Sequence, residues 1–65
     1  MKIFRYGIAK KSEVLEELER NGYKLYEYDL YYNYYTYVVN WTEERLTTRT
    51  YIFDENDILT GIKTK

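Results

Sequence analysis

Hydrophobic and polar residues alternate at the start of the chain in the way that a strand requires. Over residues 2–8, Phe4, Tyr6 and Ile8 recur at every second position, which places them on one face of an extended segment. This pattern predicts an N-terminal strand.

The next segment has the spacing of a short helix. Ser12 is a candidate N-cap, and the glutamates that follow favour the positive end of the helix dipole. Asn21 and Gly22 give a C-terminal stop, because glycine readily takes the left-handed conformation that ends many helices. The apolar stripe is narrow and consists of Val14, Leu15 and Leu18. We therefore expect a helix of about three turns from Ser12 to Asn21.

From residue 23 to the end, the pattern is that of strands separated by polar turns. Aromatic, threonine and β-branched residues, which suit a pleated surface, alternate with polar ones. There is no proline to interrupt them. The predicted strands cover residues 23–32, 34–41, 46–54 and 58–63.

The predicted order β-α-β-β-β-β indicates an α+β fold in a single domain spanning residues 1–65. A four-strand antiparallel meander follows the helix, which packs on one face of the sheet. The pattern leaves open whether the first strand lies at the sheet edge or between two others.

The aromatic content is too large for this architecture to bury completely. The chain has ten tyrosines, two phenylalanines and one tryptophan. A three-turn helix is about 15 Å long and about 10 Å wide, whereas a five-stranded sheet is about 20 Å or more across. Several rings must therefore line an uncovered face or the margin of the sheet.

Two interpretations of the exposed rings remain open. They can be cross-strand pairs that only stabilise a small sheet. They can also form a contact surface, since tyrosine and tryptophan are enriched at protein interfaces. The candidate partner-binding residues are Tyr31, Tyr32, Tyr34, Tyr35, Tyr37 and Trp41.

The composition argues against catalysis. With no histidine and no cysteine, the usual proton shuttle and the usual zinc ligands are missing. Ser12 is explained as a helix cap, and the acidic residues 43–44 and 54–57 are typical of solvated turns. We expect no catalytic residue, no metal site and no cofactor.

Charge narrows the choice of partner. Ten basic and eleven acidic residues give a net charge of −1. The tyrosine-rich segment, residues 23–41, contains two acidic residues, Glu27 and Asp29, and one lysine, Lys24. This disfavours the positive groove that accompanies base stacking, so single-stranded nucleic acid is the second choice behind protein. A structural homodimer is the third.

The composition also bears on the host of the protein, its location and its role. Residue types with AT-rich codons (Phe, Tyr, Met, Ile, Asn and Lys) make up 28 of 65 positions, against 8 for Gly, Ala, Arg and Pro. This indicates a low-GC bacterial host. With no apolar run long enough for a membrane, we expect a cytoplasmic, non-catalytic interaction module. Its expected role is that of a phage or mobile-element inhibitor, of the anti-CRISPR or anti-defence type, which occludes a larger host protein.

Overall fold

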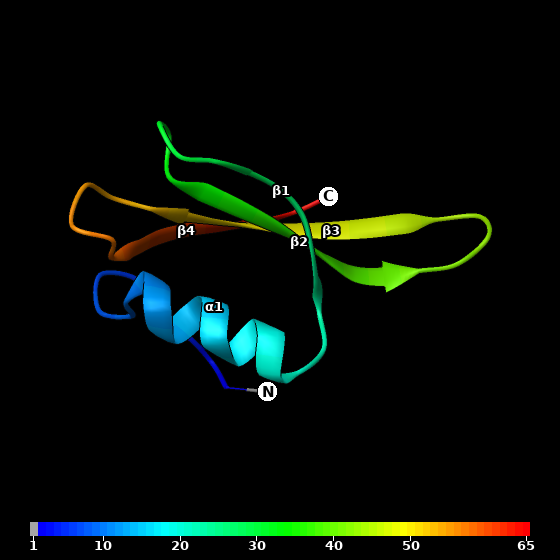
Figure 1. Cartoon of the computed structure of the whole chain (residues 1–65), viewed down its shortest axis with the longest axis horizontal. Coiled ribbons are helices and arrows are strands. Elements are labelled where there is room, and N and C mark those ends of the chain that lie inside the picture. Colours follow the sequence, from blue (N-terminus) through cyan, green and yellow to red (C-terminus); the bar gives the residue numbers. More distant parts are fainter. Residues whose placement is uncertain (1) are drawn as a thin grey trace.

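One helix and a four-stranded antiparallel sheet make up the fold, which is a small α+β architecture (Figure 1). The structure is a computed structural model that describes residues 2–65. Its elements are α1 (Lys11–Arg20), β1 (Lys24–Asp29), β2 (Tyr34–Trp41), β3 (Leu46–Phe53) and β4 (Leu59–Thr64). The strand order β1-β2-β3-β4 confirms the predicted meander.

Helix α1 begins and ends one residue earlier than predicted, with Asn21 as its C-cap. At its C-terminus, the Tyr23 amide donates to the Leu18 carbonyl at 3.1 Å and the Gly22 amide donates to the Glu19 carbonyl at 3.0 Å. Gly22 has a φ of +83°, so its lack of a side chain is what permits this ending.

At the N-terminus of α1, the cap residue is Lys10, which makes no side-chain cap. Ser12 lies inside the first turn, so its predicted capping role was wrong. Lys10 has an extended backbone because it forms a bridge with Ile58, and its carbonyl accepts the first helical bond, from Val14.

The predicted N-terminal strand is not confirmed. The Ala9 amide donates to the Arg5 carbonyl, and Gly7 has a φ of +77°, so the chain turns where the strand would continue. Phe4 is half-buried, whereas Ile8 is exposed, so the alternating face does not form. Instead, the Gly7 amide donates to the carbonyl of Leu59, and the Leu59 amide donates to the Ala9 carbonyl.

The core lies between α1 and one face of the sheet and combines aliphatic with aromatic side chains. Val14 and Leu18 of α1 are fully buried, as their spacing predicts. They share the core cluster with Tyr37, Tyr51 and Phe53 from the two central strands. The Tyr37 and Tyr51 rings meet edge to face, with centroids 6.4 Å apart, which is a favourable aromatic geometry.

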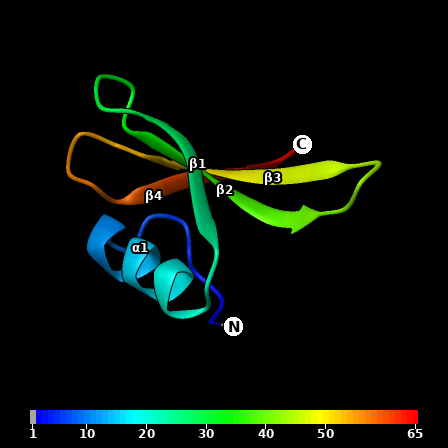
Figure 2. The ribbon, with the colours of Figure 1, turned by 45° about the vertical axis from the view of Figure 1, so that its right-hand side comes forward.

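The second face of the sheet has no helix over it (Figure 2). Six of the thirteen aromatic side chains in the described residues are exposed, in line with the predicted excess of rings. They are Tyr6, Tyr26, Tyr28, Tyr31, Tyr32 and Trp41. Not all of them lie on this face: Tyr6 precedes α1, and Tyr28 stacks on Tyr35 on the helix side.

Candidate functional site

Two of the predicted contact residues lie on the helix side of the sheet. Tyr37 is only 1% exposed, and burial, the main cause, raises the pKa of its hydroxyl. Tyr35 is half-buried, and its ring stacks on that of Tyr28 with the centroids 5.8 Å apart. The Lys11 ammonium lies over the Tyr35 ring, 5.4 Å from its centroid. Both tyrosines therefore support the fold from within.

The other four predicted residues lie in three different places. Tyr31 and Tyr32 are in the turn between β1 and β2 and are 85% and 67% exposed. Tyr34 is half-buried on the uncovered face. Trp41 is 78% exposed at the opposite end of β2. The structure brings Tyr31 and Tyr32 together and separates Trp41 from them.

The segment from Leu30 to Asn33, here called the tyrosine turn, is an apolar projection. Leu30 is 72% exposed, so three consecutive large side chains face solvent. The rings of Tyr31 and Tyr32 meet edge to face at 4.8 Å between centroids. Exposed aromatic clusters of this kind often mark interaction sites.

Hydrogen bonds fix the backbone of the tyrosine turn. The Asp29 carboxylate accepts the Tyr32 amide at 2.9 Å. Asn33 has a φ of +55°, a left-handed conformation that asparagine tolerates better than most residues. Its carbonyl accepts the Phe53 amide at 2.9 Å, which joins the turn to the end of β3.

The Asn33 side chain connects this turn to two other parts of the fold. Its Nδ2 donates to the Asp54 carbonyl at 3.0 Å and to Asp57 Oδ1 at 2.7 Å. Its Oδ1 accepts Lys11 Nζ at 3.2 Å, and Lys11 also forms an ion pair with Asp57 at 3.2 Å. The bond from Asn33, followed by that from Lys11, lowers the pKa of the Asp57 carboxyl. The start of α1 and the β3–β4 turn therefore hold the tyrosine turn in place.

Sequence reasoning did not single out Lys11, Asn33 or Asp57. The bonds to Asn33 span 22 and 24 residues, and no local pattern reports them. The only local signal was the presence of asparagine and aspartate at predicted turns.

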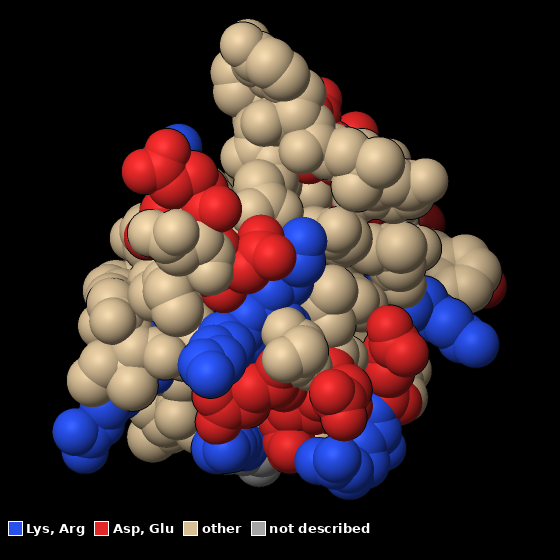
Figure 3. All heavy atoms as spheres, turned by 60° about the vertical axis from the view of Figure 1, so that its left-hand side comes forward, with Lys and Arg blue, Asp and Glu red and all other residues tan. Residues whose placement is uncertain are grey.

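A hollow of about 450 Å³ separates the tyrosine turn from the β3–β4 turn. Leu30, Tyr31 and Tyr32 line one side of it, and Asp54 and Glu55 are among the residues on the other. Figure 3 shows this end of the molecule, with an uncharged projection standing above mixed acidic and basic groups. An apolar projection with a charged surround resembles the core and rim of a protein interface.

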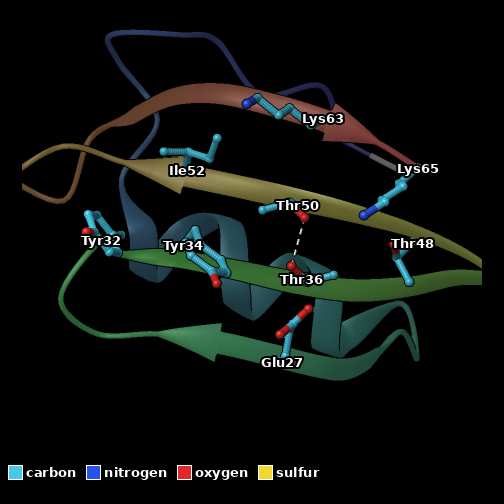
Figure 4. A pocket seen from close by; sticks show the side chains of 9 residues that line it. All are labelled: Glu27, Tyr32, Tyr34, Thr36, Thr48, Thr50, Ile52, Lys63 and Lys65. Carbon is cyan, nitrogen blue, oxygen red and sulfur yellow. Dashed lines mark hydrogen bonds between the residues drawn. The ribbon is translucent and has the colours of Figure 1, made fainter.

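A second hollow, the open-face groove, lies on the uncovered face of the sheet and has a volume of about 540 Å³ (Figure 4). The Thr36 and Thr50 hydroxyls meet at 2.7 Å in its floor. Glu27 lies on the β1 side of the groove, and Lys63 and Lys65 lie on the β4 side. The groove therefore combines apolar side chains, Tyr34 and Ile52 among them, with a threonine floor and opposite charges at its two sides.

Within residues 2–65, no group of three or more Asp and Glu side chains is placed to hold a metal ion. Over the same residues, no helix has the length and apolar character needed to cross a membrane.

Comparison with known proteins gives no further guide. No family model, curated protein or solved structure matches this chain.

Proposed function

We propose that this protein is a non-catalytic interaction module that docks on a larger protein through the tyrosine turn. The observation that carries the proposal is the combination of exposure and fixation. Tyr31 and Tyr32 are exposed, while the Tyr32 amide donates to the Asp29 carboxylate and the Asn33 side chain anchors the end of the turn. Exposed rings are common, but exposed rings on a fixed turn suit docking.

The energetic reason is preorganisation. Binding immobilises side chains and loops at a cost in entropy, and a segment that is already ordered loses less. A tyrosine has only two side-chain torsions and can provide a large contact area together with a hydroxyl for a hydrogen bond. Insertion of Tyr31 and Tyr32 into a pocket of the partner is therefore an economical mode of recognition.

Occlusion is the mechanism that follows from such docking. A module of 65 residues that fills a pocket on a larger protein covers the surface around that pocket. An inhibitor of a host system, as expected from the sequence, would act in this way without any catalytic step. Single-stranded nucleic acid is less favoured, because Asp29, Asp54 and Glu55 near the turn would repel phosphates.

The test is capture from a lysate of a low-GC bacterium with immobilised protein. The key variant is Tyr31→Ser with Tyr32→Ser, which removes both rings of the turn. Trp41→Ser is the matched control, because it removes an equally exposed ring at the other end of β2. We expect a specific protein to bind the wild type and the control but not the double variant.

Three results would contradict the proposal. The first is equal capture of the same protein by the double variant. The second is loss of capture in the Trp41 control. The third is capture that disappears after nuclease treatment and falls steeply with salt, which would instead support the nucleic-acid alternative.

A further inference from the structure

A row of four side chains crosses the uncovered face of the sheet at one level. Glu27 of β1 is paired with Thr36 of β2, Thr36 with Thr50 of β3, and Thr50 with Lys63 of β4. The row therefore begins with a carboxylate and ends with an ammonium group (Figure 4). Within residues 2–65, neither charged group has an ion-pair partner.

This arrangement is complementary to itself. Consider two such sheets that face each other and are related by a two-fold axis parallel to their strands. The rotation reverses the strand order, so β1 of one copy faces β4 of the other. It leaves positions along the strands unchanged, so each row faces the same row of the second copy. Glu27 of each copy then lies opposite Lys63 of the other, and Thr36 lies opposite Thr50. A two-fold interface needs this kind of self-complementary patch.

The adjacent row fits the same operation. Tyr34 is paired with Ile52 on the two central strands. Both side chains line the open-face groove. The two-fold axis places Tyr34 of each copy against Ile52 of the other, which brings apolar side chains together. The whole row runs Asp29, Tyr34, Ile52 and Gly61, so its central pair matches in apolar character, whereas Asp29 of each copy lies opposite the uncharged Gly61 of the other.

We propose that the open-face groove is the contact surface for a second copy of this chain, in a two-fold dimer held by reciprocal Glu27–Lys63 pairs. The occupant is a second copy because the face carries both partners of the Glu27–Lys63 contact and both partners of the Tyr34–Ile52 contact. This proposal does not depend on the proposed docking function.

The dimer is expected to be weak. Four strands about 4.8 Å apart and about six residues long present about 400 Å² per copy, or about 800 Å² in total, which is below the size of stable interfaces. The threonine floor is hollow and would retain water between the sheets. The row on the other side of Thr36 runs Lys24, Val38, Thr48 and Lys65, so the same axis places Lys24 of each copy opposite Lys65 of the other, and this like-charge contact weakens the dimer.

The orientation has a functional consequence. An axis parallel to the strands keeps the same ends of both sheets together, so the two tyrosine turns lie at one end of the dimer. Two copies of a docking element on one particle increase avidity when the partner offers two sites.

Sedimentation equilibrium at increasing protein concentration and low ionic strength tests the proposal. The wild type is expected to approach the mass of two chains. Glu27→Lys and Lys63→Glu are each expected to remain monomeric, because like charges then face each other. An equimolar mixture of the two variants is expected to form a heterodimer, because positions 27 and 63 again carry opposite charges across the interface.

Two controls carry the same changes in charge at other positions. Lys65→Glu should dimerise at least as well as the wild type, and Glu55→Lys should dimerise equally well. A monomeric wild type at millimolar concentration would overturn the proposal. So would open-ended assembly, dimerisation of either single variant at wild-type strength, or failure of the mixture to associate while circular dichroism shows both variants folded.

Discussion

Asn33 Nδ2 donates a hydrogen bond of 2.7 Å to Asp57 Oδ1 and so joins the β1–β2 turn to the β3–β4 turn. Lys11 contacts both residues from the start of α1. Three segments that are distant in the sequence meet at this point, directly behind the exposed rings of Tyr31 and Tyr32. The polar group that fixes the turn and the aromatic group proposed to bind are thus adjacent.

Substitution of Asn33 should separate the stability that comes from its side-chain hydrogen bonds from the stability that comes from its tolerance of a left-handed backbone. Asn33→Gly removes the side-chain bonds but permits the left-handed backbone, and we expect a loss of about 1–2 kcal/mol in the free energy of unfolding. Asn33→Ala should lose about 1 kcal/mol more, because alanine is strained at positive φ. Urea denaturation of both variants measures the difference. Equal stability of the two variants would show that the left-handed backbone is not retained.

The stability of the protein at acid pH should depend on Asp57. Its pKa is lowered in the folded state, chiefly by the bond from Asn33. Its contribution to stability is therefore complete above the ordinary aspartate pKa of about 3.9 and is lost as the pH falls through the lowered value. Asp57→Asn should flatten the dependence of stability on pH in this acid range, whereas Glu44→Gln should leave it unchanged. If the stability of Asp57→Asn depends on pH in this acid range as that of the wild type does, Asp57 does not make this contribution.

Tyr37 should affect stability rather than binding. Its side chain is 1% exposed and packs against Tyr51, so Tyr37→Ala should cost about 3–5 kcal/mol or unfold the protein. Tyr37→Phe keeps the ring and should keep the fold. Tyr31→Ala, at an exposed position, should change stability by no more than about 0.5 kcal/mol. Chemical denaturation measures the free energy of unfolding of the three variants. A small loss of stability in Tyr37→Ala would show that this ring lies outside the core.

The tyrosine turn should be ordered on the picosecond to nanosecond timescale. Because Asp29 and Asn33 fix its backbone, we expect amide order parameters near those of the strands, about 0.85. Nitrogen-15 relaxation measures these values directly. Values below about 0.6 over residues 30–33 would remove the preorganisation on which the docking proposal rests.

The pattern of hydrophobic residues was sufficient to predict the helix and the four-strand meander, because each has a clear period and a polar stop. It failed at the N-terminus, where the turn at Gly7 ends an alternation that resembles a strand. Tyr35 and Tyr37 are two positions apart in β2, so alternation places them on one face. It could not indicate that α1 covers that face, because the placement of the helix depends on packing between distant segments.

The candidate site was predictable only in part. The small area of the helix predicts exposed rings, but the predicted strand 23–32 placed Tyr31 and Tyr32 in a strand, whereas β1 ends at Asp29 and both residues lie in the turn. Irregularities in pairing between Leu25 and Glu27 and between Val38 and Asn40 change the register, and no simple alternation shows them. The network around Asn33 depends on side chains more than twenty residues apart, which meet only in the folded chain.

Site-specific photo-crosslinking tests the docking proposal most directly. A photoreactive phenylalanine analogue is placed at position 31, and in a matched protein at position 41, and each is irradiated in the lysate of a low-GC bacterium. We predict that position 31 forms a discrete adduct with one protein, that an excess of unlabelled wild type abolishes this adduct, and that position 41 does not form it. The same adduct from position 41, or no competable adduct from position 31, would contradict the account.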